Sequence, residues 1–480
     1  MPKPFLRLII RRRGAALCAG IALAALAGTG CQPQPAQTFR ATVPPTALAE
    51  APVYSPTPTR TPTLTPTATL TETPTRTPTL TPTRTPSPTP TVPLLTPTPP
   101  RPDGAPAAYR HLPAELAPTA GWSCDDFPCA DDVEGFLRRI RVPIGYTLTH
   151  VGRFPGQPMQ IAYGPDGRLY ATVIENGATR AGAVYALDTD GRARRYSGDF
   201  VSPVGLAFQP GTDVLYVSAR LTMTSGGGLW RVPPGGGAPE TVLADLPCCF
   251  SLIDNQPNGL TFGPDGYLYL GVGALSDRAE PPNPQAASMA NLHPLEAAVL
   301  RVQPHTGEVS VYAAGLRNPY DLAFDAAGQL YATDQGLVSG IGDRLLAVEA
   351  GAHYGWPFWR ERGCAECPLR PGGLAVAPDL LRFPPYTIPR GLTVYTGTQF
   401  PVNLFGSLFV ALWNGVDGGQ RVVRVDPASV PQPDENQPYP PAEPFITGLI
   451  RPIDVTVAPD GALVVADYIY GHVWRVRYRQ

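Results

Sequence analysis

Short apolar runs separated by polar turns recur along the chain from residue 158 onward. Six times an apolar run leads into a turn and then into a second apolar run, at 158–170, 203–216, 258–269, 319–331, 391–409 and 452–464. Three of these turns are Pro-Asp-Gly, at 165–167, 264–266 and 459–461. This tripeptide between alternating apolar residues is typical of a tight hairpin. The pattern therefore predicts a repeated pair of β-strands.

A third apolar run follows each pair. These runs lie at 183–187, 229–232, 299–302, 345–348, 422–425 and 473–476. A fourth run leads to the next unit, as at 309–315. In the last unit, however, only four residues follow the third run at 473–476, so its outer strand is expected from the segment 144–150 instead. The prediction is an all-β chain that forms a six-bladed β-propeller of four-stranded blades over 144–480, closed by pairing both of its ends.

The N-terminal segment has a different pattern. Three arginines at 11–13 precede an apolar run at 15–27, and small residues lead to Cys31. This predicts a signal peptide at 1–31, of the lipoprotein type in which Cys31 is acylated. Simple cleavage, an uncleaved anchor and twin-arginine export are the alternatives.

Residues 32–110 are rich in Pro and Thr, with Thr-Pro units from about 52 to 102. Such a segment has no apolar face to bury, so we expect a disordered, extended stalk. A cysteine-containing lead-in segment at 111–143 connects it to the propeller. The expected location is extracytoplasmic, either secreted or anchored to the cell envelope, with membrane contact only through the N-terminal anchor.

Composition excludes some functions. The formal net charge is −2 and the pI is about 6.3, so no basic surface is expected to attract nucleic acid. Lys3, within the signal peptide, is the sole lysine. Lysine-based covalent chemistry therefore has no candidate in the mature protein.

Six cysteines remain beyond the signal peptide. They are Cys124, Cys129, Cys248, Cys249, Cys364 and Cys367. An even number in an exported protein favours disulfides. Cys124 and Cys129 could close one loop, and Cys364 and Cys367 another, whereas Cys248 and Cys249 either join each other or cross to the 364–367 loop. The paired spacings that zinc sites require are not present.

Several stretches resemble one enzyme family. They are Gly-Pro-Asp-Gly-Tyr-Leu-Tyr at 263–269, Gly-Leu-Arg-Asn-Pro at 315–319, His-Tyr-Gly-Trp-Pro at 353–357, Tyr-Thr-Gly-Thr-Gln-Phe-Pro at 395–401 and the segment 451–461. Over about residues 145–480 the chain resembles the glucose/sorbosone dehydrogenase family, six-bladed quinoproteins that oxidise sugars with pyrroloquinoline quinone (PQQ) and calcium.

This resemblance implies a set of site residues. Arg317 and Asn318 would bind the quinone, whose carboxylates suit a planar guanidinium; the alternative is that Arg317 only holds a carbonyl between blades. The loop at 333–337 would face the calcium ion, with Gly336 and Leu337 as backbone oxygen ligands. Further cofactor-binding candidates from this alignment are Gln335, Arg390 and Arg421.

The chain departs from the family where catalysis is expected. The family's general base is a histidine, and Asn255 stands at that position, four residues before Gly259. An amide cannot accept a proton at neutral pH. Ala274 stands where the family has the aspartate that supports the histidine. Asp277 and His293 are the nearby candidates to substitute, although a single loop histidine is more often a surface residue.

Three functions remain open at this point. The first is a quinoprotein dehydrogenase acting on a sugar, alcohol or aldehyde, with catalysis weakened or altered by Asn255. The second is a non-catalytic propeller that binds a carbohydrate or a protein partner. The third is a calcium-dependent lactonase, which would require Asp254, Asp277 and Asp334 to converge on the central axis.

Overall fold

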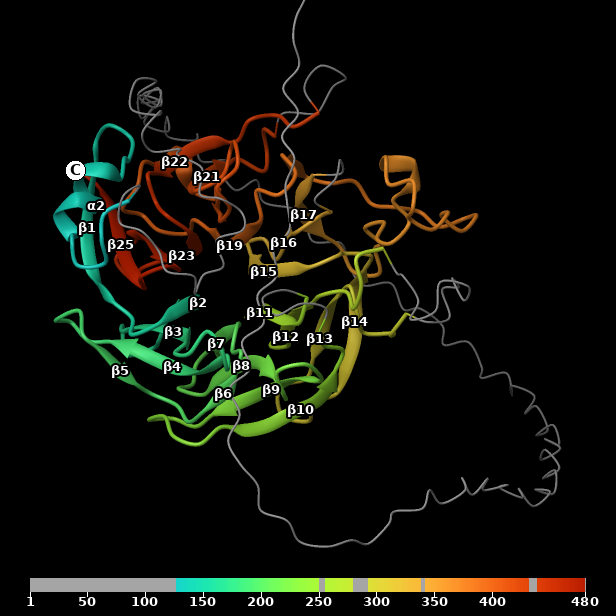
Figure 1. Ribbon diagram of the computed structural model, residues 1–480, viewed down its shortest axis with the longest axis horizontal. Helices are drawn as coiled ribbons and strands as arrows, with labels where there is room; N and C mark the ends of the chain where they lie inside the picture. The colour runs from blue at the N-terminus through green and yellow to red at the C-terminus, as the bar shows by residue number, and fades with distance from the viewer. Residues whose placement is uncertain (1–126, 250–254, 279–291, 338–341, 431–437, 480) are drawn as a thin grey trace, which may run out of the picture. The chain divides into compact units, whose positions relative to one another are not determined.

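The computed structural model describes residues 127–249, 255–278, 292–337, 342–430 and 438–479 (Figure 1). The chain divides into two units, Met1–Pro88 and Thr89–Gln480, and every described residue lies in the second. The predicted signal peptide, the predicted stalk and Cys124 lie outside the described residues. The regular secondary structure of the described part is mostly β-strand with few helical residues, which confirms that the fold is all-β.

Three sheets each contain four antiparallel strands in chain order. The strands are β11 (Pro257–Phe262), β12 (Leu268–Val272), β13 (Ala298–Val302) and β14 (Val309–Ala314) in the first; β15 (Pro319–Phe324), β16 (Leu330–Asp334), β17 (Asp343–Val348) and β18 (Leu381–Phe383) in the second; and β19 (Pro389–Val394), β20 (Leu408–Leu412), β21 (Arg421–Val425) and β22 (Glu443–Thr447) in the third. Every residue of the second strands β12, β16 and β20 is buried. Their mostly apolar sequences are consistent with sheets that are covered on both faces.

A larger sheet of nine strands combines the first two sequence repeats. It contains β2 (Gln157–Tyr163), β3 (Leu169–Ile174), β4 (Ala181–Leu187), β5 (Ala193–Arg195), β6 (Phe200–Val201), β7 (Leu206–Phe208), β8 (Leu215–Arg220), β9 (Gly227–Val232) and β10 (Glu240–Leu246). The short strand β6 pairs with both β4 and β8 and so joins the two repeats. This bridge was not predicted, because two residues are too few to produce a sequence pattern.

The last sheet joins the two ends of the described chain. It contains β1 (Tyr146–Arg153), β25 (His472–Tyr478), β24 (Leu463–Asp467) and β23 (Pro452–Val457) in that order. β1 pairs with β25 in an antiparallel register that matches Tyr146 with Tyr478. The predicted pairing of the two ends is confirmed.

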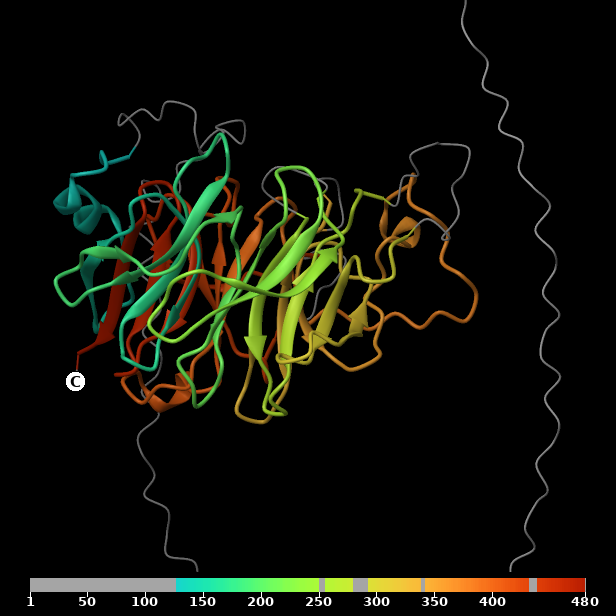
Figure 2. The same cartoon turned by 90° about the horizontal axis from the view of Figure 1, so that it is seen from below.

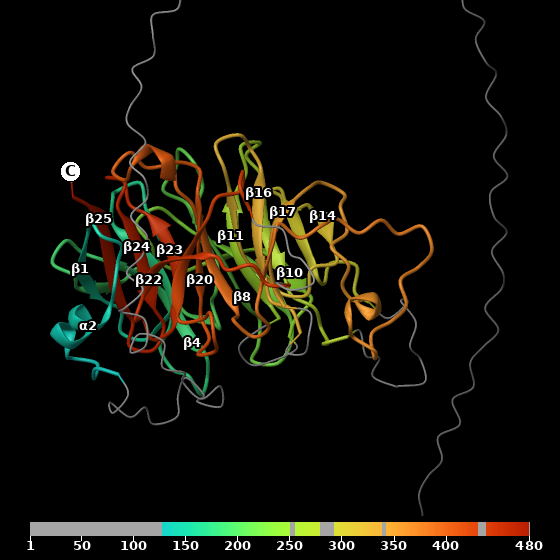
Figure 3. The ribbon, with the colours of Figure 1, turned by 90° about the horizontal axis from the view of Figure 1, so that it is seen from above.

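The sheets are arranged around a common centre (Figure 1). Their first strands contact one another in a closed ring in the order β2, β7, β11, β15, β19, β23 and back to β2. Edge-on views show the strands running between the two faces of this ring (Figure 2 and Figure 3). The hairpins with Gly167, Gly266 and Gly461 have the predicted turn, each glycine having a φ near +80°. We call the opposite face, where the first strands begin, the site face.

Equivalent positions near the start of the first strands meet at the centre. They hold Gln160, Gly205, Gly259, Asp321, Gly391 and Asp454. The Asp321 carboxyl accepts hydrogen bonds from Gln160 Nε2 at 2.5 Å and from the Leu392 backbone N–H at 2.7 Å, and it contacts the Asp454 carboxyl. Both aspartates are only 2% exposed. Side chains from several strands therefore fill the centre.

A short helix, α2 (Val133–Arg139), covers the outer side of the closing sheet. The Asp132 side chain caps its N-terminus by accepting a hydrogen bond from the Gly135 N–H at 2.7 Å. Phe136 packs against His472 and Trp474 of β25, with ring centroids 5.1 and 5.6 Å away. Two 3₁₀ helices, η3 (Arg360–Arg362) and η4 (Val402–Leu404), lie in loops. Within the described ranges, no helix is long and apolar enough to cross a membrane.

Candidate active site

Asn255 lies immediately before β11 on the site face, and its side chain has a fixed orientation. Its backbone is left-handed, with φ of 51°, which asparagine tolerates better than most residues. The amide Nδ2 donates to the Ala274 carbonyl at 2.9 Å, and the residue is 1% exposed. Its Oδ1 atom has no hydrogen-bond partner among the described residues. The amide therefore presents an unused buried acceptor.

Arg317 and Asn318 lie at the start of β15, beside Asn255. The Arg317 carbonyl accepts a hydrogen bond from the Ala274 N–H at 2.8 Å, which ties this turn to the end of β12. The Arg317 guanidinium donates to the Gln335 carbonyl at 3.2 Å, and its Nε atom has no partner within the described part of the chain. Arg317 thus holds a carbonyl of the loop after β16, which belongs to the same sheet as β15, and keeps its Nε donor unused.

Asn318 links three strands. Its Oδ1 atom accepts a hydrogen bond from Asn258 of β11 at 2.7 Å. Its Nδ2 atom donates to the Gln335 side-chain oxygen at 3.5 Å. Asn318 is fully buried and Gln335 is 6% exposed. The side-chain oxygen of Gln335 is therefore engaged by Asn318 rather than left free.

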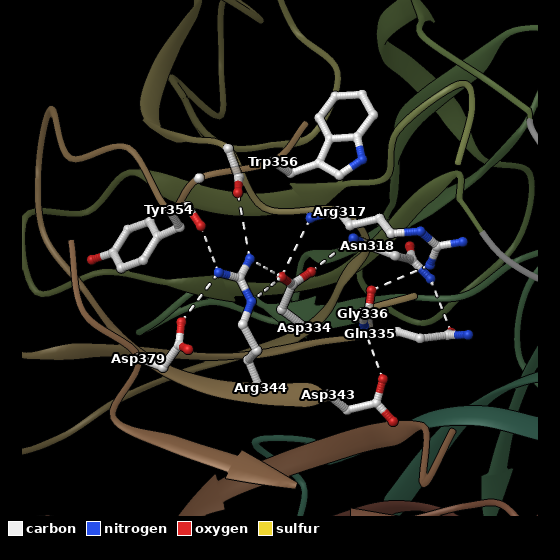
Figure 4. Close-up of polar contacts among 12 residues, drawn as sticks. Arg317, Asn318, Asp334, Gln335, Gly336, Asp343, Arg344, Tyr354, Trp356 and Asp379 are labelled. Atoms are coloured by element: carbon white, nitrogen blue, oxygen red, sulfur yellow. Dashed lines mark hydrogen bonds and ion pairs between the residues drawn. The ribbon is translucent and has the colours of Figure 1, made fainter. Parts of the chain in front are cut away.

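Asp334, the last residue of β16, holds the Arg317–Asn318 turn from below (Figure 4). Its carboxylate accepts hydrogen bonds from the backbone N–H of Asn318 at 2.7 Å and of Arg317 at 3.3 Å. The same carboxylate forms an ion pair with Arg344, whose Nε lies 3.0 Å away. Both side chains are fully buried, so their charges compensate each other without help from water.

Asp277 lies in the loop after β12 and forms an ion pair with Arg317. Its side chain is 34% exposed. Its backbone carbonyl accepts a hydrogen bond from the indole N–H of Trp356 at 2.9 Å. The structure therefore brings Asp277 into the site, but as a partner of Arg317.

Glu296, which the sequence did not single out, is a buried carboxylate close to Ala274. It accepts hydrogen bonds from the backbone N–H of Leu275 at 2.6 Å and of His293 at 2.7 Å. Burial raises the pKa of Glu296 above its usual value. His293 itself is exposed, and its Nδ1 accepts from the Leu295 N–H at 3.1 Å. Glu296, not His293, is the buried acid–base group of this loop.

A second group of cationic side chains lies where β19 and β23 begin. The Arg390 guanidinium stacks on Tyr320, 4.4 Å from the ring centroid, and the Arg451 guanidinium lies 4.2 Å from the centroid of Trp413. Arg451 is 1% exposed, and burial lowers its pKa to about 10. Its Nη2 has no partner in the described ranges. Arg451 begins the segment 451–461 that carries part of the family resemblance, but its sequence context did not predict it as a site residue.

The loop after β16 was expected to provide backbone oxygens for calcium. The Gly336 N–H donates to Asp343 at 2.8 Å, and the Asp343 carboxyl also accepts from the Ile388 N–H at 2.7 Å. Burial raises the pKa of Asp343 to about 6. Leu337 is buried, and residues 338–341, which follow it, are not described. Among the described residues, no group of three His, Cys, Asp or Glu could hold a metal.

Other predicted residues lie further out. Arg421 is the first residue of β21, the third strand of its sheet, and its Nε donates to the Gly419 carbonyl at 3.0 Å. The sulfur atoms of Cys364 and Cys367 are bonded to each other, as are those of Cys248 and Cys249. Cys129 is also in a disulfide. The first of these loops packs against Leu337, Ala274 and Trp356.

The segment that carries these residues is similar to known proteins. Residues 254–473 match the model of the family described as Glucose / Sorbosone dehydrogenase. That segment includes the Asn255, Arg317, Asp334 and Arg451 positions. This part of the chain is similar to the glucose/sorbosone dehydrogenase family.

Individual proteins are also similar to this chain. Quinoprotein glucose dehydrogenase B of Acinetobacter calcoaceticus is 31% identical over 141 residues, which cover 25% of this chain and 28% of that protein. The chain spans about half or less of the length of the curated relatives it matches. A putative glucose dehydrogenase of Thermus thermophilus has a TM-score of 0.53 at 24% identity, covering 69% of this chain and 100% of that one. The apo soluble aldose sugar dehydrogenase of Escherichia coli has a TM-score of 0.55 at 17% identity, covering 70% and 100%.

These neighbours share the β-propeller fold with this chain. The third interpretation, a lactonase with converging carboxylates, finds no support among the described residues. Asp277 is paired with Arg317 and Asp334 with Arg344, while Asp254 lies outside the described ranges.

Proposed function

We propose that this propeller binds PQQ with calcium on the site face and oxidises a sugar or a related alcohol or aldehyde. The observation that carries the proposal is that two buried guanidinium groups there, Arg317 and Arg451, each keep a nitrogen without a partner among the described residues. A buried, unpaired donor is costly, so such atoms indicate a missing acceptor. The carboxylates of PQQ are acceptors of the required charge.

The calcium ion would be held chiefly by backbone oxygens. Gly336 and Leu337 are the candidates, and the hydrogen bond from the Gly336 N–H to Asp343 holds this part of the loop in place. Carbonyl oxygens are among the ligands that calcium uses in proteins.

The proton that leaves the substrate hydroxyl needs an acceptor in this chain, whereas a bound quinone would supply the acceptor for the hydride equivalent. Asn255 donates through Nδ2 to the Ala274 carbonyl and can accept a hydrogen bond through Oδ1, but an amide is not a base. It can therefore orient a hydroxyl but cannot remove its proton. Catalysis then depends on Glu296, whose pKa is raised, or proceeds without a base.

A second candidate function rests on the same amide. If no carboxylate replaces the family histidine, the site face binds a carbohydrate or another ligand without oxidising it. The two functions are separated by titrating the purified protein with PQQ and calcium, followed by absorbance, and by dye-reduction assays with a panel of aldoses.

We expect wild-type protein to bind PQQ in the presence of calcium and to oxidise aldoses slowly. Asn255→His should raise turnover, since a general base typically contributes about 10²–10⁴-fold, and Glu296→Gln should abolish the slow activity if Glu296 is the base. PQQ binding with no turnover in wild type and Asn255→His favours the binding propeller. Absence of PQQ binding in every variant refutes the quinoprotein proposal.

Three further features belong to this proposal. The nine-stranded sheet is taken as two four-stranded blades joined by β6, which makes six blades in all. Residues 1–31 are a signal peptide that exports the chain. Acylated Cys31 and the 32–110 stalk then hold the propeller at the cell envelope.

A further inference from the structure

Arg344 makes contacts in several directions at once. Besides its ion pair with Asp334, its Nη1 donates to the Tyr354 carbonyl at 2.5 Å, and its Nη2 donates to the Gly315 carbonyl at 3.4 Å. Asp379 lies 3.2 Å from Nη1. The charges of Arg344 and Arg362 outweigh the effect of burial and lower the pKa of Asp379 to about 2, so Asp379 stays ionised. Arg344 is therefore fully paired.

One set of these contacts reaches Arg317 through its backbone. Arg344 fixes the Asp334 carboxylate, and that carboxylate accepts the N–H groups of both Arg317 and Asn318 (Figure 4). Because the ion pair is fully buried, neither side chain can turn toward water without losing its partner. The turn that carries Arg317 is thus held in one position.

A second set reaches Arg317 through its guanidinium. The Tyr354 carbonyl that Arg344 holds is two residues before Trp356, whose indole donates to the Asp277 carbonyl at 2.9 Å. The Asp277 carboxylate in turn pairs with the Arg317 guanidinium. Arg344 is therefore linked to Arg317 in two ways, to its backbone through Asp334 and to its guanidinium through Asp277.

Another sheet of the same molecule provides a comparison. Asp467 ends β24 as Asp334 ends β16, and it accepts the N–H groups of Ile450 at 2.7 Å and Arg451 at 3.2 Å. Among the ion pairs of the described residues, none involves Asp467. A strand-end aspartate can thus hold such a turn without an arginine, which means that blade geometry alone does not require Arg344.

We propose that Arg344 is a positioning residue that fixes the direction of the Arg317 guanidinium toward an anionic ligand on the site face. This inference rests on the proposed function, because it concerns the same site. Arg344 does not touch the ligand. It acts through Asp334 on one side and through Tyr354, Trp356 and Asp277 on the other.

The test is a double-mutant cycle with PQQ and calcium as the probe. Arg344→Met should weaken PQQ binding about tenfold in the wild-type background. In the Arg317→Ala background, the same substitution should change affinity less than about twofold, because the group it orients is absent. Both backgrounds should show the same fall in melting temperature, since the buried charge that Arg344 leaves unpaired is present in each.

Two more variants complete the design. Trp356→Phe removes the indole N–H that holds the Asp277 carbonyl, together with part of a buried ring, and should weaken binding by a smaller factor with a moderate fall in melting temperature. Val184→Ala, a buried position of β4 in another sheet, is the matched control: it should lower the melting temperature and leave affinity unchanged. The inference is overturned, and the proposed function is not, if Arg344→Met weakens PQQ binding equally in both backgrounds or does not weaken it in the wild-type background. If Arg344→Met does not fold, unchanged affinity in Trp356→Phe overturns it. A wild type that binds no PQQ refutes the proposed function and this inference together.

Discussion

Asn255 and Arg317 show how single residues determine what this site can do. Asn255 presents a buried amide oxygen that can accept a hydrogen bond, but an amide cannot take a proton at neutral pH. Arg317 keeps its charge and shares it between a backbone carbonyl and Asp277. The proposed site therefore has a cationic side chain suited to an anionic ligand, whereas the acid–base group near Asn255 is the buried carboxyl of Glu296.

Arg317→Ala should weaken PQQ binding by about 1.5–3 kcal/mol, the usual contribution of a charge-assisted hydrogen bond. Absorbance titration in the presence of calcium measures the change. Arg424→Ala is a suitable control, because Arg424 is a similarly enclosed arginine that pairs with Glu443 at 2.9 Å on another sheet. Identical affinities for wild type and Arg317→Ala would return Arg317 to a purely structural role.

At the scale of strands and loops, the local patterns in the sequence were sufficient for some features and not for others. The hairpins and the third strands were predicted, because alternating apolar residues and Pro-Asp-Gly turns act over a few residues. Arg344 and Glu296 were missed, since their importance comes from partners on other strands and loops that no spacing reveals. Arg390 was placed on the site face through the family resemblance, whereas Arg451 was seen only as part of a motif.

The first strands also contain a buried acid pair whose ionisation should affect stability. Burial raises the pKa of Asp321 to about 7 and also raises that of Asp454, which lies against it. In the unfolded chain both carboxyls titrate near pH 4. Between about pH 4 and pH 7 the folded state therefore binds more protons than the unfolded state. For this reason the contribution of the pair to the free energy of unfolding falls as the pH rises.

Asp321→Asn should reduce this loss. We expect the free energy of unfolding of the variant, relative to wild type, to rise by on the order of 2 kcal/mol between pH 4.5 and pH 7.5. Urea unfolding at the two pH values measures it. The comparison must be with wild type, because burial lowers the pKa of His472 to about 4, which acts in the opposite direction but equally in both proteins. A constant difference across this range would contradict the buried-pair interpretation.

For the molecule as a whole, the described domain is a closed arrangement of sheets, and the segment before it is proposed to set its location. Export and attachment through Cys31 would hold the site face at the cell envelope, near external sugars. Nothing in the fold of the domain requires the anchor. Location and chemistry should therefore be separable by mutation.

Cys31→Ala should release the protein from the membrane fraction into the soluble extracytoplasmic fraction without changing PQQ affinity, because acylation of this cysteine is the proposed anchor. Cell fractionation followed by immunoblotting measures the distribution. Cys18→Ala, within the apolar run of the signal peptide, is the control and should leave the distribution unchanged. Retention of the Cys31→Ala protein in the membrane fraction would place the anchor elsewhere.

The pairing of β1 with β25 has a consequence for the order of events during synthesis. β1 is made first among the described strands, and its partner is made last. Until the ribosome has released the C-terminal residues, β1 has no neighbour and one edge of the ring stays open. Contacts between such distant parts of a chain form slowly, so the nascent domain has an exposed strand edge for most of its synthesis. A chain truncated before β25 would keep that edge permanently, and with it a site for pairing with other chains.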